Sequence, residues 1–253
     1  PTRVGLASPP MAIPDTTPDT TPDTVMVVAA GDPFEIRADL PPADLVVAAD
    51  GGLGLATGLD LSVDMLVGDL DCVDALHAAD AGRRGVAVER HPREKDETDL
   101  ELAIERALRE RPRRIHVVAG AGGMLDHAVV NLVVLASPRW AGVELTATVG
   151  AADVCVVRTV VELPGVVGDR VSLVPVGGPA VGVTSWGLLW RLENATLDPY
   201  SGRGLANEIV TEPARIEVDD GVLLAISAPA PSNGPAPVRA RVRSRSSWTG
   251  SRS

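Results

Sequence analysis

The sequence predicts an α/β protein in which a Rossmann-like domain with a parallel sheet is followed by a small antiparallel β-sandwich. Up to residue 150, short runs rich in valine and alanine alternate with helical or glycine-rich stretches, which is typical of parallel strands joined by crossover helices. From residue 153 onward, the helical periodicity disappears, and short strands follow one another between Gly and Pro residues. A composition of 45% hydrophobic and 23% charged residues is sufficient for a buried core.

Six strand-like runs define the first domain. They lie at residues 25–30, 44–50, 63–69, 86–90, 114–120 and 144–150. A helix is expected from about Asp96, where Thr98 and Glu101 form a capping box, and it should stop at Pro112. A second helix is expected from about Asp126, and because its sequence is apolar almost all round, it should be buried on more than one side.

The two predicted domains occupy the middle of the chain. The α/β domain spans residues 25–150, and the β-sandwich domain spans residues 151–228. Residues 1–24 contain a repeat of Pro, Asp and Thr, which predicts a disordered segment. Residues 229–253 are rich in Pro and Ser and hold five Arg and no acid, so this tail is also expected to be disordered.

The charge and the cysteine content argue against several classes of protein. A net charge of -11 argues against nucleic acid as a partner. There is no apolar run of about 18 residues and no signal-peptide pattern, so we expect no membrane association and a cytoplasmic location. The two cysteines, Cys72 and Cys155, lack the spacing of a disulfide framework or of a zinc site.

Acidic residues follow four of the predicted strands. The motifs are ADGG at 49–52, GDLD at 68–71, HPREKDETD at 91–99 and GAGGMLDH at 120–127. Any one of them fits an ordinary turn or helix cap, but four in succession indicate a ligand site, because parallel sheets bind ligands at the carboxyl ends of their strands. Clustered carboxylates need a cation, and Mg²⁺ bridging Asp69 and Asp71 would let an acidic cleft hold a polyanion.

Glycines in the same loops suit phosphate binding. Gly51, Gly52, Gly122 and Gly123 would let backbone N–H groups approach phosphate oxygens, and the helix start at Thr98 offers further donors. The glycines do not fit the dinucleotide motif GxGxxG, and the sequence contains no P-loop. The remaining chemistry is phosphoryl-type transfer by positioning and Mg²⁺, without a covalent intermediate.

In their order and spacing, the motifs resemble those of the thiamine pyrophosphokinase (thiamine diphosphokinase) family, from about Val25 to Ile226. They are ADGG at 49–52, VGDLDCVD at 67–74, KDETDLE at 95–101, GGMLDHAVVNL at 122–132, LVPVGGPAVGVTSWGLLWRL at 173–192 and GLANE at 204–208. The resemblance implies transfer of a pyrophosphoryl group from ATP to the hydroxyl of thiamine, giving thiamine diphosphate and AMP. It also implies an ATP- and Mg²⁺-binding catalytic domain, a thiamine-binding β-sandwich, and a homodimer whose active site lies at the subunit interface.

The resemblance also implies roles for the acidic residues. Asp69 and Asp71 match the main Mg²⁺ ligands, and Asp50 and Asp99 are expected close to the same metal. Asp71 or Asp99 would accept the proton of the thiamine hydroxyl as the new bond forms. Further residues implied for the ATP site are Asp96, Thr98, Asp126, His127 and Asn131.

The second domain carries the residues expected on the thiamine side. Trp186 and Trp190 are four residues apart, so on one strand they would share a face and could stack on the flat thiamine cation, or else fill the sandwich core. The resemblance adds Thr184, Ser185 and Asn207 to the same side.

Three positions depart from the usual motifs of the family. Cys72 and Ala206 each stand where a Ser is usual, and Met124 stands where an Arg is usual. A charge directed at phosphate would then come from Arg93, Lys95 or an Arg of a partner subunit. Two alternatives therefore stay open. One is a non-catalytic module that binds thiamine or a nucleotide, and the other is a related pyrophosphotransferase with another alcohol acceptor.

Overall fold

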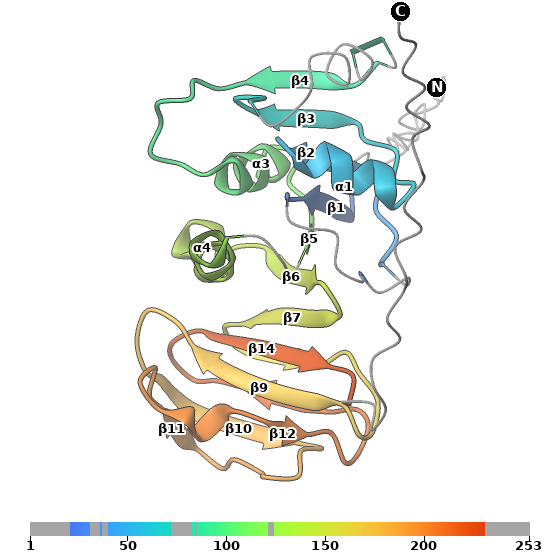
Figure 1. Ribbon diagram of the computed structural model, residues 1–253. Helices are drawn as coiled ribbons and strands as arrows, with labels where there is room; N and C mark the ends of the chain where they lie inside the picture. The colour runs from blue at the N-terminus through green and yellow to red at the C-terminus, as the bar shows by residue number, and fades with distance from the viewer. Residues whose placement is uncertain are drawn as a thin grey trace, which may run out of the picture. The chain divides into compact units, whose positions relative to one another are not determined.

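The structure is a computed structural model that describes residues 21–30, 36, 40–71, 82–83, 85–120 and 124–230, and the chain divides into two compact units (Figure 1). The first unit ends at Val156 and the second begins at Val157, whereas the sequence predicted a boundary between residues 150 and 151. The two terminal segments expected to be disordered lie almost wholly outside the described residues. Among the described residues, no helix is long and apolar enough to cross a membrane.

In the described part of the first unit, seven strands form one sheet in the order β7-β6-β5-β1-β2-β3-β4. Strands β1 to β6 pair in parallel, and β7 runs antiparallel to β6. The strands are β1 (Thr24–Val28), β2 (Leu45–Ala49), β3 (Met65–Gly68), β4 (Ala87–Arg90), β5 (Arg114–Ala119), β6 (Glu144–Val149) and β7 (Ala152–Val157). Strand β1 is buried along its whole length, as expected for a central parallel strand. The predicted parallel sheet is therefore confirmed.

The described helices of the first unit follow the strands. They are α1 (Gly52–Gly58), α3 (Asp99–Leu108), α4 (Leu125–Leu135) and the short 3-10 helix η1 (Pro138–Trp140). Helix α3 begins with the predicted capping box, in which Thr98 Oγ1 accepts a hydrogen bond from Glu101 N at 3.2 Å and Glu101 Oε2 accepts one from Thr98 N at 2.9 Å. This cap places the first residue of the helix, Asp99, beside the ends of the strands.

The burial predicted for the second helix is wrong for the chain taken alone. In α4, Leu135 is the one residue whose side chain is fully buried, while Val129, Val130 and Val133 are 51%, 45% and 51% exposed. The apolar pattern of a helix indicates that it needs a packing partner, but not which surface supplies one. This helix therefore presents an apolar face outward.

The described second unit is built from two antiparallel sheets, as the predicted sandwich requires. One has the order β12-β9-β14, with β12 (Asn207–Glu208), β9 (Arg170–Pro175) and β14 (Leu223–Ala228). The other has the order β11-β10-β13-β8, with β11 (Ala195–Leu197), β10 (Ala180–Trp186), β13 (Arg215–Glu217) and β8 (Val160–Glu162). The 3-10 helix η2 (Gly202–Gly204) precedes β12. Buried residues alternate with exposed ones along β9 and β11, so each sheet has one apolar face.

Candidate active site

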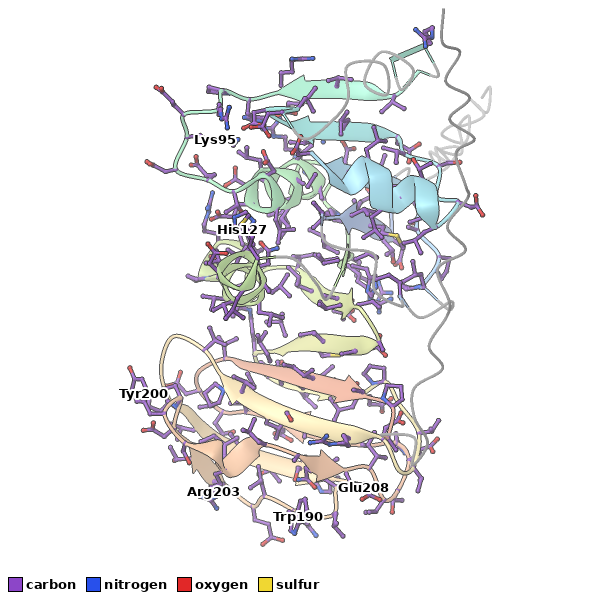
Figure 2. The ribbon with its side chains drawn as sticks, viewed as in Figure 1. Lys95, His127, Trp190, Tyr200, Arg203 and Glu208 are labelled. Atoms are coloured by element: carbon purple, nitrogen blue, oxygen red, sulfur yellow. The ribbon has the colours of Figure 1, made fainter. Side chains whose placement is uncertain are left out.

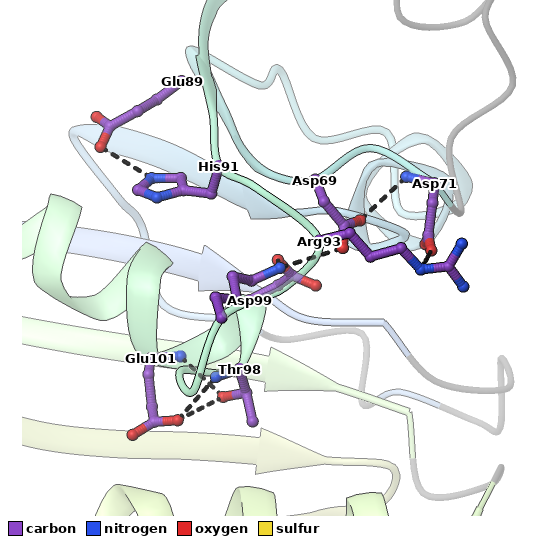
Figure 3. A network of polar contacts seen from close by, with 9 residues as sticks. Asp69, Asp71, Glu89, His91, Arg93, Thr98, Asp99 and Glu101 are labelled. Carbon is purple, nitrogen blue, oxygen red and sulfur yellow. Dashed lines mark hydrogen bonds and ion pairs between the residues drawn. The ribbon is translucent and has the colours of Figure 1, made fainter.

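Three aspartates come together at the carboxyl ends of neighbouring strands. Asp50 directly follows β2, Asp69 directly follows β3, and Asp99 begins α3. Each offers one carboxylate oxygen, and these oxygens all lie within 4.8 Å of one another. We call these three residues the acid cluster. Figure 3 shows Asp69 and Asp99 facing each other across the site.

The backbone around the acid cluster is shaped for this close approach. Asp50 has a left-handed φ of 42°, and Gly68 has a φ of +145°. A Cβ atom added to Gly68 would lie 3.0 Å from Asp50 Cβ and 3.0 Å from Asp99 Oδ1. Because real Cβ atoms rarely approach other atoms so closely, only glycine at position 68 lets the two aspartates pack across the end of β3.

The acid cluster is incompletely satisfied by the protein itself. Asp50 is 5% exposed, and its Oδ1 atom has no hydrogen-bond partner among the described residues. Asp99 Oδ1 is instead paired with the ammonium of Lys95, 3.1 Å away, so within the described chain the unpartnered oxygen of the cluster is that of Asp50. Buried carboxylate oxygens without partners are costly, and an all-oxygen donor set of this kind suits Mg²⁺. The residues present therefore fit a divalent cation.

The pKa values of two of these acids are shifted in opposite directions. The pKa of Asp69 is lowered, first because its carboxylate accepts a hydrogen bond from the backbone N–H of Asp71 and also because Lys95 is close. The pKa of Asp99 is raised, first by desolvation and then by the negative charges of Asp50 and Asp69. Neighbouring carboxylates with divergent pKa values are a feature of catalytic sites.

Lys95 lies against the acid cluster, which the sequence reasoning missed. It was expected as a charge directed at phosphate, but its Nζ atom lies 3.1 Å from Asp69 Oδ2 and 3.1 Å from Asp99 Oδ1. Its side chain is 11% exposed. Burial alone would lower its pKa, but the contacts with Asp99 and Asp69 outweigh this, so the pKa of Lys95 is raised. The signal that could have found it is composition, because Lys95 is the single lysine of the chain.

The remaining predicted acids lie apart from the acid cluster. Asp71 is not among the three clustered residues, and its Oδ2 atom is 3.3 Å from Arg93 Nε at the protein surface. Asp96 is exposed. The structure thus brings together three of the four predicted metal ligands and places Asp71 two residues away on the same loop (Figure 3).

The described residues predicted to bind phosphate lie at or near helix starts, and Thr98 among them caps α3. Gly51 caps α1, and a Cβ atom added to Gly52 would lie 1.9 Å from the carbonyl oxygen of Val28, so α1 starts directly against the end of β1. Asp126 and His127 are exposed in the first turn of α4, and Asn131 is half-buried one turn later. Gly122, Gly123 and Cys72 lie outside the described residues.

The predicted thiamine-side tryptophans do not lie on one strand. Strand β10 ends at Trp186, and the chain turns at Gly187, whose φ is +75°. Trp190 therefore belongs to the following loop, where its side chain is 60% exposed (Figure 2). The guanidinium of Arg215 stacks over the Trp186 ring, 5.0 Å from its centroid. The expectation that the two rings share a strand face is wrong, because a glycine with positive φ breaks the strand between them.

The polar residues predicted on the thiamine side hold this loop in place. Ser185 is fully buried, and its hydroxyl accepts a hydrogen bond from Leu192 N at 2.8 Å. Thr184 Oγ1 accepts one from Asn194 N at 3.1 Å. The amide of Asn207 accepts from Trp190 N at 3.0 Å and donates to Trp190 O at 2.8 Å. These three side chains fix the backbone that carries the exposed Trp190 ring.

Family models match both units of the chain. The catalytic domain of thiamin pyrophosphokinase matches residues 39–147, and the vitamin B1 binding domain of thiamin pyrophosphokinase matches residues 159–223. Among curated proteins, Thiamine pyrophosphokinase 1 of Oryza sativa subsp. japonica is 25% identical over 182 residues. The match covers 65% of this chain and 66% of that protein, so this chain spans just under two thirds of the relative's length.

Solved structures of proteins that carry the name thiamine pyrophosphokinase share the fold of this chain. The thiamine pyrophosphokinase of Bacillus subtilis superposes with a TM-score of 0.70 at 19% identity, covering 82% of this chain and 100% of that chain. A thiamin pyrophosphokinase family protein of Enterococcus faecalis gives a TM-score of 0.71 at 24% identity, covering 82% of this chain and 99% of that chain. Because the models of the catalytic and the vitamin B1 binding domain both match, the chain belongs to the thiamine pyrophosphokinase family.

Proposed function

We propose that this protein is a Mg²⁺-dependent thiamine pyrophosphokinase, which transfers a pyrophosphoryl group from ATP to the hydroxyl of thiamine and yields thiamine diphosphate and AMP. The observation that carries the proposal is the acid cluster at the ends of β2 and β3, in a chain with both domains of this family. A protein that only binds thiamine has little need of three converging carboxylates. The acid cluster therefore favours an enzyme over a module that binds thiamine alone, and turnover distinguishes the enzyme from a module that binds a nucleotide.

The acid cluster would hold the metal through Asp50, Asp69 and Asp99. A bound Mg²⁺ would neutralise charge on the phosphates and on the transition state of the transfer. Asp50 supplies a buried carboxylate oxygen without a hydrogen-bond partner among the described residues, and Gly68 keeps the space between Asp50 and Asp99 open. The protein's own part is thus to hold three oxygens in a fixed arrangement before substrates arrive.

Asp71 lies on the same loop as Asp69 but is a candidate for proton transfer and not for metal binding. Its side chain is 39% exposed and faces Arg93, whereas the side chains of Asp69 and Asp99 are 12% and 28% exposed and Asp50 is buried. An exposed carboxylate next to the metal loop could accept the proton of the thiamine hydroxyl, which has a high pKa and is a weak nucleophile. Asp99, the other candidate for this proton, already contributes a carboxylate oxygen to the acid cluster, whereas Asp71 does not. We therefore favour Asp71 for the proton and Asp99 for the metal.

On the thiamine side, the Trp190 ring is the better candidate for stacking. One face of Trp186 already carries the guanidinium of Arg215, and a second cation such as thiamine would be repelled from that neighbourhood. Trp190 is exposed, and the Asn207 side chain hydrogen-bonds both the backbone N–H and the carbonyl of Trp190. Because the backbone that carries the ring is already ordered, less conformational entropy is lost when a flat cation binds there.

We also propose that the protein is a homodimer, with a second copy covering the exposed apolar face of α4. Three valines of this helix, Val129, Val130 and Val133, are about half exposed, and apolar helix faces of this kind are typical of interfaces. That the active site lies at the subunit interface, and that the protein acts in the cytoplasm, remain predictions from the sequence.

Binding and turnover measured together would separate the proposed function from its alternatives. Calorimetry with thiamine, and product analysis with thiamine and MgATP, are carried out on the wild type and on Asp50→Asn, which keeps the shape of the side chain but removes its charge. We expect thiamine to bind both proteins and product to form only with the wild type. Thiamine binding without product in the wild type would favour the non-catalytic module. Product formation only with another alcohol would favour the related pyrophosphotransferase.

A further inference from the structure

The position of Lys95 is unusual for this chain. Among 23 basic residues, Lys95 is the single lysine, so every other cationic side chain is an arginine. An ammonium is a compact point charge, whereas a guanidinium is a broad planar fork that needs more room. The Lys95 side chain is 11% exposed and its ammonium lies between two carboxylates, where the smaller of the two cationic groups suits the position.

The ammonium of Lys95 binds two members of the acid cluster. Its Nζ atom donates a hydrogen bond to Asp69 Oδ2 at 3.1 Å and is 3.1 Å from Asp99 Oδ1. One positive charge thus faces three carboxylates, and Asp50 Oδ1 keeps no hydrogen-bond partner among the described residues. The acid cluster is held together by the lysine but is not neutralised by it.

We propose that Lys95 is a tethered counter-ion of the acid cluster, which holds Asp69 and Asp99 in place before a divalent cation binds and competes with that cation for the same two carboxylates. This inference rests on the proposed function, because it takes the acid cluster as the metal site. The lysine lowers the repulsion among the acids in the metal-free protein, since without it three carboxylates would face one another at close range. The same contacts must weaken when a divalent cation arrives, so the lysine reduces the intrinsic metal affinity. Lys95 is therefore a positioning residue that stabilises the folded metal-free protein and weakens its affinity for the metal.

The test compares three full-length proteins: the wild type, Lys95→Met and Arg93→Met. Methionine matches the apolar stem of the lysine side chain and lacks its terminal ammonium, so it removes the charge. Arg93→Met is the matched control, because it removes one positive charge from a neighbouring position whose side chain is 82% exposed and pairs with Asp71 outside the acid cluster. The two measurements are thermal unfolding in EDTA and calorimetric titration with Mn²⁺ alone, in the absence of nucleotide.

For Lys95→Met, we expect a lower melting temperature in EDTA and a Kd for Mn²⁺ that is smaller by about tenfold or more, because one competing charge at close range is gone. For Arg93→Met, we expect the Kd for Mn²⁺ to change less than about twofold and the melting temperature to change little. An unchanged or larger Kd in Lys95→Met would overturn the proposal, even if this variant were less stable. If Mn²⁺ bound none of the three proteins, the acid cluster would not be a metal site by itself and the role of Lys95 would be refuted, while the product assay with thiamine and MgATP would decide the proposed function separately. Normal Mn²⁺ binding with equal Kd in the wild type and Lys95→Met would refute only the role of Lys95.

Discussion

The acid cluster gathers three like charges, and among the described residues Lys95 is the cation that contacts two of them directly. Asp50, Asp69 and Asp99 come from three different segments, and each is placed by a regular element that ends or begins beside it. Lys95 compensates part of their repulsion. Such an arrangement is costly in the protein alone, and the proposed divalent cation would offset that cost by binding the same carboxylates.

Asparagine substitutions at Asp69 and Asp71 should separate metal binding from proton transfer. In Asp69→Asn, we expect the Kd for Mn²⁺ to rise by about tenfold or more, because a clustered ligand loses its charge. In Asp71→Asn, we expect the Kd to change less than about threefold while kcat falls by about two orders of magnitude, since this residue lies outside the acid cluster. Calorimetry and steady-state kinetics provide the two readings. Equal losses of Mn²⁺ affinity in both variants would show that Asp71 is a metal ligand after all.

Gly68→Ala tests whether the glycine between the two aspartates is required. Alanine would adopt an unfavourable positive φ and would also press on Asp50 Cβ and Asp99 Oδ1 at 3.0 Å. Gly85→Ala is the matched control, because Gly85 has a φ of +85° but has nothing within 4 Å of an added Cβ. We expect the control to lose about 1 kcal/mol of unfolding free energy and Gly68→Ala to lose about 2–3 kcal/mol. Denaturant unfolding measures both, and equal losses would mean that the crowding has no consequence.

The sequence predicted the location of these residues better than it predicted their contacts. The strand ends at Asp50 and Asp69 could be read from the apolar runs before them, and the start of α3 from Thr98 and Glu101. The side-chain directions after a strand end depend on single backbone angles, such as the φ of 42° at Asp50, which no periodic pattern encodes. For this reason Asp71 could not be distinguished from Asp69, and Lys95 was not recognised as their neighbour.

At the scale of elements, the difference between predicted and observed burial is greatest in α4. Its apolar sequence predicted burial on several sides, yet the described chain leaves Val129, Val130 and Val133 about half exposed. The apolar runs predicted β1 to β6 correctly, because a parallel strand pairs with other strands of its own sheet. A helix whose partner lies on another molecule carries the same apolar signal, and one sequence does not distinguish the two cases.

Charged substitutions on α4 test whether a second copy covers it. We expect the wild type to be a dimer at micromolar concentration, and the double variant Val129→Glu with Val133→Glu to be a monomer, because burying two carboxylates in an apolar contact is costly. Val88→Glu is the control, since Val88 on β4 is exposed to a similar degree, at 43%. Light scattering coupled to size-exclusion chromatography gives the mass of each protein. A monomeric wild type, or a double variant that stays dimeric, would contradict an interface at α4.

At the scale of the whole molecule, a buried histidine links folding stability to pH. His116 on β5 is 6% exposed, and its ring nitrogens contact the hydroxyls of Thr146 at 2.8 Å and Thr148 at 3.1 Å. Desolvation by burial, with a smaller contribution from Arg114, lowers the pKa of His116 from 6.5 to about 4. Between these two values the unfolded chain binds a proton that the folded protein does not, so protonation favours the unfolded state.

The free energy of unfolding should therefore fall as the pH drops through the window from 6.5 to 4. A shift of this size corresponds to a loss of about 3 kcal/mol from His116 when the window has been crossed. The variant His116→Gln keeps a polar group for Thr146 and Thr148 but does not titrate, so its stability should fall by about 3 kcal/mol less over the same range. Denaturant unfolding at a series of pH values measures the difference. Parallel pH profiles for the two proteins would refute the coupling.

The proposed function requires that two phosphoryl groups pass from ATP to thiamine in one step. In the proposed reaction the thiamine hydroxyl attacks the β-phosphorus of ATP, so the nucleotide product is AMP. The most direct measurement is a time course of nucleotide and thiamine products after the protein is mixed with thiamine and MgATP, resolved by anion-exchange chromatography. We predict AMP and thiamine diphosphate in equal amounts, both abolished in Asp50→Asn. ADP with thiamine monophosphate, or hydrolysis of ATP without any thiamine product, would contradict the transfer of a pyrophosphoryl group to thiamine.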